Sequence, residues 1–331
     1  MSEVQNKTTI ENNSEILFIY DARMCNPNGD PDDENKPRMD YNRSVNLVSD
    51  LRLKRYIRDY LMDYKDEIIF VCKVDGANKL PKERIEILCS TEKKEINLKK
   101  IKKEDIDWLL TKLPDIRLFG AIIPDCNFEV GGNATFTGPV QFNWGHSLNK
   151  VTGPMESSGI TSHFRTGESK EAGAMGKDYR VDYSLIAFHG IISAKRAEYT
   201  DLKDGDIDLF DDAMIHAIPL EATTRSKTGQ YPLLYIRVEY NTPEFFLGDL
   251  RRYVKIVDKN NGDMSFEDTA KLRSPKEYKL DLTKLTEKLD SNKDKINNIY
   301  FWQHQDLEIK GWENMDYKPL PKPKKGTQSH G

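Results

Sequence analysis

Cations clustered on one predicted helix are the residues of this chain best suited to chemistry, and that chemistry is anion binding. Residues 48–64 read VSDLRLKRYIRDYLMDY, and a helix turns successive side chains by about 100°. Lysine and arginine side chains then share one side, and a serine precedes the first turn. Free N–H groups at a helix start and fixed positive charge both attract phosphate. The candidate residues are Ser49, Arg52, Lys54, Arg55 and Arg58.

The same pattern also fits an ordinary surface helix whose charged side is merely solvated. Asp59 and Asp63 lie among the cations and dilute their charge. The whole chain has a formal net charge of −4, so no global positive field attracts nucleic acid. Any polyanion site must therefore be a local patch on an acidic protein.

Other groups that could do chemistry give weaker signals. The turn predicted for 26–31 (NPNGDP) leads into an acidic run: Asp30, Asp32, Asp33 and Glu34. This run lacks the spacing of a calcium loop. The four cysteines are far apart with no C-x-x-C pair, which argues against zinc and against a disulfide framework. No phosphate-binding glycine motif is present either, so we expect no metal and no cofactor.

Hydrophobic periodicity indicates the elements that must position these residues. The helix over 48–64 turns an apolar stripe inward: Leu53, Tyr56, Ile57, Tyr60, Leu61 and Tyr64. Strands are predicted over 16–21, 68–74, 85–89, 118–124, 134–144, 180–194, 231–241 and 299–302, and further helices over 104–113, 206–218 and 280–289. Residues 145–179 show no sustained period, which predicts an irregular loop of functional importance.

This order of elements predicts an α+β fold. Strand, helix, a strand-rich middle, helix and strand follow the βαββαβ order of ferredoxin-like and RRM-like domains. In that arrangement both helices cover one face of the sheet and the other face stays open. The polar N-terminal residues and the lack of any run near ~18–20 apolar residues predict a soluble, cytoplasmic protein.

Four motifs in this order resemble the repeated backbone subunit of type I CRISPR effector complexes (Cascade). This is the Cas-seven family, and the resemblance is greatest to its subtype I-B branch, the Csh-two type. The motifs are 26–31 (NPNGDP), 37–40 (PRMD), 48–58 (VSDLRLKRYIR) and 182–194 (DYSLIAFHGIISA).

The resemblance implies an RRM-like palm with an inserted finger region and a protruding thumb. The palm would comprise 15–74, 115–150 and 180–245, with the finger at 75–114, the thumb at 151–179, an addition packed on the palm at 246–317 and a disordered basic tail at 318–331.

The resemblance also implies how guide RNA is held. The helix over 48–64 would bind guide phosphates through the five residues named above, and the thumb would place Met175 beside a displaced base. The remaining candidate RNA-binding residues are His163, Arg165, Lys177, Arg225, Ser226 and Lys227. We find no aromatic pattern for base stacking on the sheet, which fits a protein that accepts any guide sequence.

The predicted function is non-catalytic. Copies of the chain would stack head-to-tail along a CRISPR guide RNA (crRNA) and present it to a target DNA strand in antiviral defence. The other expected partners are the guide 5′-handle-binding subunit, the large and small subunits and the recruited helicase-nuclease, with no membrane. The alternative is an aspartate-dependent RNA endonuclease subunit, as in type III complexes, using Asp30, Asp32, Asp33 or Asp40. A single acidic loop without a clustered histidine supports it poorly, so no catalytic residue is assigned.

Overall fold

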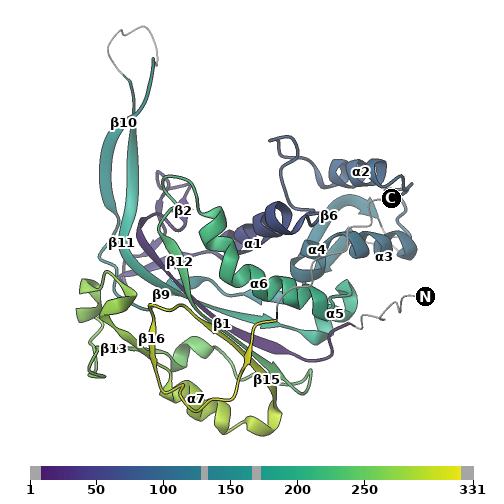
Figure 1. Cartoon of the computed structure of the whole chain (residues 1–331). Helices are drawn as coiled ribbons and strands as arrows, with labels where there is room; N and C mark the ends of the chain where they lie inside the picture. The colour runs from purple at the N-terminus through teal and green to yellow at the C-terminus, as the bar shows by residue number, and fades with distance from the viewer. Residues whose placement is uncertain (1–8, 128–132, 166–172, 322–331) are drawn as a thin grey trace.

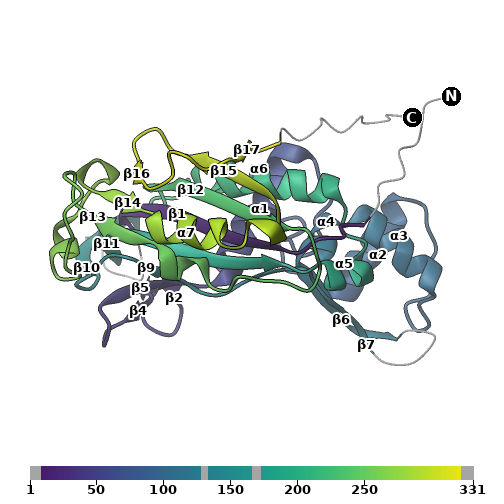
Figure 2. The ribbon, with the colours of Figure 1, turned by 90° about the horizontal axis from the view of Figure 1, so that it is seen from below.

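A mixed sheet forms the centre of the computed structural model, which describes residues 9–127, 133–165 and 173–321 (Figures 1 and 2). Its strands run in the order β17 (Lys318–Pro319), β15 (Ile296–Gln303), β12 (Gln230–Tyr240), β1 (Ser14–Cys25), β11 (Gly173–Ile192), β9 (Gly145–Ser147), β5 (Val45–Val48) and β4 (Met39–Asp40), while β8 (Val140–Phe142) and β10 (Met155–Arg165) also pair with β11. The predicted combination of helices with one principal sheet is confirmed.

Strand β1 lies in the middle of this sheet and pairs antiparallel with β11 and β12. Ile16 and Phe18 pack with the helices on one face, whereas Leu17 and Ile19 pack with the C-terminal layer on the other. Because both faces are covered, the strand is apolar without alternation. The strand predicted over 16–21 corresponds to the middle of β1.

Helices α1 (Asp50–Lys65) and α6 (Asp204–Glu221) cover one face of the sheet. The predicted apolar stripe of α1 is buried at five of its six positions, and Tyr64 is the exception at 50% exposed. Tyr60 joins the two helices, because its hydroxyl donates to Asp212 at 2.7 Å. The other helices are α2 (Pro81–Thr91), α3 (Lys103–Lys112), α4 (Pro114–Phe119), α5 (Ala194–Thr200) and α7 (Thr283–Asp290).

The predicted βαββαβ order leaves the second face of the sheet open, but in the structure this face is covered. Residues that follow β12 cover it with the 3-10 turn η1 (Leu250–Tyr253), α7 and a small sheet of β13 (Lys255–Val257), β14 (Lys279–Asp281) and β16 (Glu308–Lys310) (Figure 2). Leu250, Leu280 and Leu285 are fully buried against the strands. Both faces of β1 therefore contribute to a hydrophobic core.

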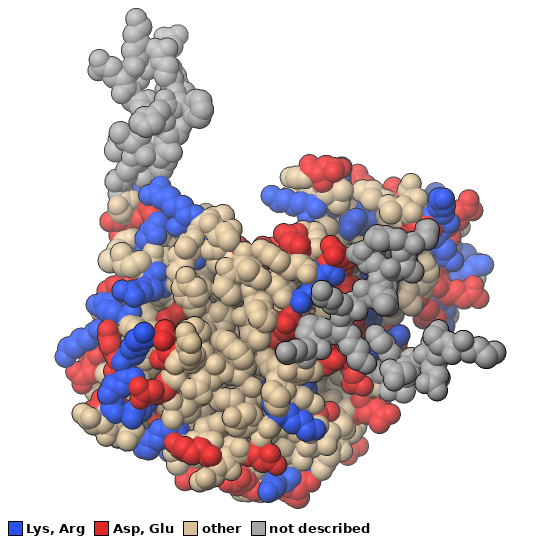
Figure 3. All heavy atoms as spheres, in the orientation of Figure 1, with Lys and Arg blue, Asp and Glu red and all other residues tan. Residues whose placement is uncertain are grey.

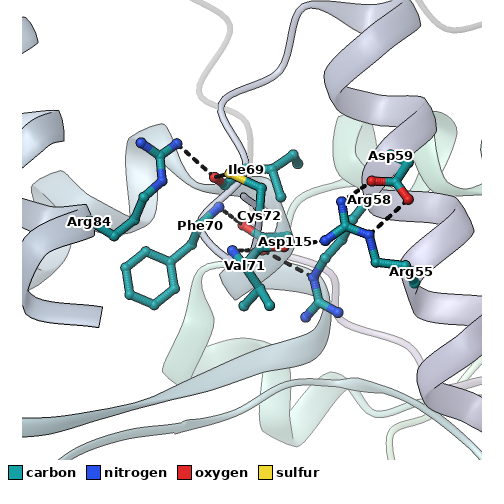
Figure 4. Close-up of polar contacts among 9 residues, drawn as sticks. All are labelled: Arg55, Arg58, Asp59, Ile69, Phe70, Val71, Cys72, Arg84 and Asp115. Atoms are coloured by element: carbon teal, nitrogen blue, oxygen red, sulfur yellow. Dashed lines mark hydrogen bonds and ion pairs between the residues drawn. The ribbon is translucent and has the colours of Figure 1, made fainter. Parts of the chain in front are cut away.

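The strand predicted over 68–74 does not form. Asp115 at the start of α4 accepts hydrogen bonds from the N–H groups of Phe70 and Val71 at 2.9 and 3.0 Å (Figure 4). These two N–H groups are thereby removed from any strand ladder, and the chain bends instead of extending. The carboxylate is fully buried and lies about forty-five residues away in sequence, so local periodicity could not detect it.

The strand predicted over 85–89 is wrong as well, because this segment belongs to α2. Proline at the first helical position suits a helix start, and Ile85 and Leu88 at i, i+3 spacing point into a separate small core. The strand predicted over 118–124 begins as the end of α4 and continues as β6 (Gly120–Asn127), which pairs with β7 (Asn133–Thr137). The predicted helices over 104–113, 206–218 and 280–289 correspond to α3, α6 and α7.

The segment predicted to be an irregular loop is a long hairpin that projects from the sheet (Figure 1). Strands β10 and β11 pair antiparallel, with Met155 opposite Arg180 and Ser158 opposite Lys177. Strand β11 belongs to the central sheet at its C-terminal end and continues beyond the sheet at its N-terminal end. Its strand conformation therefore continues into a polar, glycine-rich sequence that has weak β propensity of its own.

The C-terminal tail is not wholly irregular in the residues described. Lys318 and Pro319 form β17, which pairs parallel with Tyr300 and Phe301 of β15. Residues 322–331, which complete the predicted disordered tail, lie outside the described part of the chain. Within that part, no helix combines the length and apolarity needed to cross a membrane.

We predict that Asp211→Asn destabilises the fold strongly. Asp211 of α6 accepts hydrogen bonds from Tyr235 and Arg237 of β12 at 2.6 and 2.7 Å, and both partners are buried. Removal of the carboxylate charge leaves the Arg237 cation buried and uncompensated, which lowers the free energy of unfolding by about 3–5 kcal/mol. The measurement is urea unfolding followed by circular dichroism.

The matched control for this variant is Glu198→Gln, which disrupts the exposed ion pair with Lys195 and should leave the unfolding midpoint unchanged. Equal midpoint shifts in the two variants would contradict the stabilising role of the buried pair.

Candidate nucleic-acid interface

The start of α1 is held by the turn at residues 26–31. Ser49 is the N-cap, as predicted, since its Oγ accepts a hydrogen bond from the Arg52 N–H at 3.3 Å. Both the N–H and the hydroxyl of Ser49 donate to the side-chain carbonyl of Asn28, at 2.8 and 2.9 Å. Asn28 therefore fixes the first turn of the helix to the loop that leaves β1. Asn28 lies within the NPNGDP motif, but no local pattern predicts its contact with Ser49.

Arg52 and Lys227 bring two positive charges together beside this helix start. The Arg52 guanidinium stacks over the Tyr56 ring at 3.9 Å, and its Nε is buried without a hydrogen-bond partner. Lys227 Nζ donates to the Asn26 carbonyl at 2.7 Å. Burial, followed by the charge of Arg52, lowers the pKa of Lys227 to about 8. The start of α1 thus holds two positive charges near each other, an arrangement that favours an anion beside it.

Three distant segments meet at this cation pair. The Asn26 N–H, after the end of β1, donates to the Ser226 carbonyl at 2.7 Å. Gln230, at the start of β12, donates to the Tyr56 hydroxyl of α1 and to the Lys227 carbonyl at 3.1 and 2.8 Å. The loop before β12 is therefore fixed against β1 and α1, and the start of α1 lies beside residues 225–227.

Arg225 and Lys177 lie farther out, where the hairpin leaves the sheet. Arg225 is 66% exposed, with one guanidinium nitrogen 3.5 Å from Asp178. Lys177 is 54% exposed and lies between two carboxylates, 3.6 Å from Glu34 and 3.4 Å from Glu156. Cations gather below the base of the hairpin, whereas the middle of the same face carries few charges (Figure 3).

The predicted basic patch of Lys54, Arg55 and Arg58 is not a free cationic face. Lys54 is buried, and its Nζ donates to Asp50 at 3.2 Å and to Gln141 at 2.9 Å. Arg58 is also buried, and its Nε donates to Asp115 at 3.1 Å (Figure 4). This prediction is corrected because the chain after α1 folds back over that side of the helix.

Arg55 is partly exposed but is engaged in the same region. Its guanidinium forms two hydrogen bonds with Asp59 and donates to the Val71 carbonyl at 2.9 Å (Figure 4). Of the predicted cations on α1, Arg52 is the one without a carboxylate partner among the described residues.

The predicted hairpin residues are placed only in part. Met175 lies opposite Ile160 in the pairing of β10 and β11. The side chains of His163, Arg165 and Met175 lie outside the described part of the structure.

The aspartates of the nuclease alternative do not converge. Asp30 pairs with Arg38 at 3.1 Å, Asp33 pairs with Lys36 at 2.6 Å, and Asp40 lies 3.7 Å from Arg43. Within the described ranges, no group of three or more histidine, cysteine, aspartate or glutamate side chains is arranged to hold a metal ion.

Comparisons of the sequence with known proteins agree on one family. The family model described as "CRISPR-associated protein Cas7" matches residues 12–283. A Haloferax volcanii protein described as "CRISPR-associated protein Cas7" is 33% identical over 314 residues, which cover 91% of this chain and 89% of that protein. A solved chain from a structure described as "CRISPR RNA-guided surveillance complex, pre-nicking" has a TM-score of 0.50 at 12% identity, covering 90% of this chain and 95% of that one. At this identity, the structural likeness concerns the fold alone.

We predict that Arg52→Gln raises the pKa of Lys227. The charge of Arg52 disfavours the protonated amine, so its removal should shift the titration of Lys227 above pH 8 while burial still holds it below its ordinary range. NMR of isotopically methylated lysines measures this titration directly. The matched control Arg225→Gln removes a cation from the same loop and should leave the titration in place. Identical curves for Arg52→Gln and the unmodified protein would contradict the assigned coupling.

Proposed function

The chain belongs to the CRISPR-associated protein Cas7 family, and on this premise we propose that it is the guide-RNA-binding backbone subunit of a Cascade-type effector complex. The observation that carries this proposal beyond family membership is the paired cation site of Arg52 and Lys227 at the start of α1. Such a site binds phosphate without reading a base. A subunit that must hold any guide needs this kind of contact, because base pairing carries the specificity.

We propose that the sheet is an RRM-like palm. Strands β12, β1, β11 and β9 lie side by side, with α1 and α6 on one face, which supports this assignment. RRM domains commonly stack RNA bases on the open face of the sheet. Here that face is covered by the C-terminal layer, so guide contacts come from the loops at the end of β1 instead.

We further propose that the β10–β11 hairpin is the thumb and that the segment 75–114, with α2 and α3, is the finger region (Figure 1). Copies of the chain would stack head-to-tail on the guide, and each thumb would displace one nucleotide at a regular interval. On this hairpin, His163 and Arg165 would contact the guide RNA, and Met175 would lie beside the displaced base.

Within the palm, the proposed guide-contacting residues are Arg52, Arg225, Ser226 and Lys227, while the buried Ser49 positions them by capping α1. Arg55 and Lys177 flank this surface and already have carboxylate partners. Lys54 and Arg58 support α1 from within rather than meeting the guide, because both are buried.

The proposed partners follow from this role. The chain would meet the target DNA strand through the paired guide, and it would contact the handle-binding, large and small subunits of a subtype I-B complex in the cytoplasm. A helicase-nuclease recruited to that complex would carry out cleavage, so no catalytic residue is proposed for this chain.

The deciding experiment is nuclease protection of a guide-length RNA as the protein is titrated. A backbone subunit should give protected lengths that grow in equal steps, one for each added copy. A single short footprint at all protein concentrations would overturn the filament. RNA degradation without added nuclease, lost in Asp30→Ala or Asp33→Ala, would favour the endonuclease alternative instead.

We predict that the double variant Arg52→Gln/Lys227→Gln weakens guide binding independently of guide sequence. Loss of two phosphate contacts should reduce the slope of log K against log salt by about 1.4, at about 0.7 per contact with single-stranded RNA. Fluorescence anisotropy at several salt concentrations measures this slope. The control Lys195→Gln/Lys271→Gln removes two exposed lysine charges elsewhere and should leave it unchanged. An unchanged slope in the first variant would refute the site.

A further inference from the structure

The projecting hairpin needs support at its base. Beyond the central sheet, β10 and β11 pair only with each other among the described residues, and an isolated two-stranded hairpin is marginally stable in water. A thumb that spaces nucleotides regularly must nevertheless keep one angle to the palm. The contacts that fix this angle therefore have to lie where the hairpin leaves the sheet.

One side of this base is held by the acidic turn that sequence analysis could not assign a role. The Tyr179 hydroxyl of β11 donates a hydrogen bond to the Glu34 carboxylate. Lys177 lies 3.6 Å from the same carboxylate and 3.4 Å from Glu156 of β10, so it links the turn to both hairpin strands. Lys36, two residues after Glu34, lies 5.4 Å from the centre of the Tyr179 ring. The turn thus contacts the hairpin at several points.

The other side of the base is held by Arg180. Its guanidinium donates to the Met24 carbonyl near the end of β1 at 2.7 Å and to the Arg225 carbonyl at 3.3 Å. Asp178 accepts from Arg180 at 2.8 Å. The hairpin is therefore fixed between the acidic turn and the loop that carries Lys227.

The acidic turn has a conformation that presents Glu34 in one direction. Glu34 and Asn35 both adopt left-handed backbone angles, with φ of 47° and 59°. The side chain of Asn26 donates to the Asn35 carbonyl at 2.7 Å. A Cβ at Gly29 would lie 2.0 Å from the Asn35 side-chain oxygen, so only glycine permits this close approach. The turn is thereby held as a compact unit between residues 26 and 36.

The same compact turn also holds the start of α1, because Asn28 accepts both hydrogen bonds from Ser49. We propose that the 26–36 turn is a brace that couples the angle of the hairpin to the anion site at the start of α1, with Glu34 as its positioning residue. This inference rests on the proposed guide-binding function, because the hairpin angle is taken to be coupled to the binding of a guide phosphate at the start of α1. By linkage, a phosphate that orders the helix start also orders the hairpin base, and the ordered hairpin favours the phosphate equally.

Hydrogen exchange of the free protein tests the brace without RNA. In Glu34→Ala and Tyr179→Phe, amides in 155–165 and 173–180 should exchange roughly two- to fivefold faster, as expected for loss of a partly exposed charged contact, with the melting temperature unchanged. Glu34→Gln retains an acceptor for the Tyr179 hydroxyl and should recover part of the protection. The matched control Asp32→Asn removes one exposed charge from the same turn, where the Asp32 N–H donates to Asp30 rather than to the hairpin, and should exchange like the parent.

Stepwise nuclease protection then tests the coupling. At saturating protein, Glu34→Ala should still protect RNA, but its steps should lose their equal length, whereas Asp32→Asn should keep them. Faster hairpin exchange with equal steps retained would overturn the coupling and leave the guide-binding function intact. Unchanged exchange would overturn the brace itself. If the parent protein gives no steps at all, the proposed function fails, while the exchange result still decides whether Glu34 supports the hairpin.

Discussion

The immobilisation of β1 is the constraint on which the rest of the structure depends. All its side chains except those of Arg23 and Met24 are buried, and its backbone is paired along both edges, so the residue that ends it, Cys25, has a fixed place in the molecule. The chain that leaves this point can therefore meet α1, the Lys227 loop and the hairpin with the short contacts described above. The proposed anion site at the start of α1 thereby has a fixed geometry.

The distribution of charge on α1 follows from desolvation rather than from sequence. Lys54 and Arg58 are covered by other segments, and a buried cation is tolerated only beside a carboxylate or an acceptor, which Asp50, Gln141 and Asp115 supply. Arg52 lies nearer the helix start, where the Tyr56 ring supports its guanidinium instead. Among the described residues, the cation of α1 proposed to bind phosphate, Arg52, is thus the one that has no carboxylate partner.

Sequence reasoning succeeded where a local pattern decides the structure and failed where a distant partner decides it. The period of α1 and its Ser49 cap could be predicted, because both depend on neighbouring residues. The bend at Phe70 and Val71 could not be predicted, since it depends on hydrogen bonds to Asp115, which is distant in sequence. The hairpin was missed for a similar reason, because its strands inherit their pairing from the core. The link between Ser49 and Lys227 required the tertiary contacts of Asn26 and Asn28.

The short strand β17 has a consequence for a chain whose copies are proposed to crowd along one polymer. Such crowding raises the local concentration of every exposed strand edge and so favours uncontrolled aggregation. At Tyr300 and Phe301, the outer edge of β15 is occupied by Lys318 and Pro319. A proline offers no N–H to an incoming strand, and a lysine charge repels another copy of itself. Lys318 and Pro319 thereby limit strand-to-strand pairing between copies at this edge while the proposed stack holds them close together.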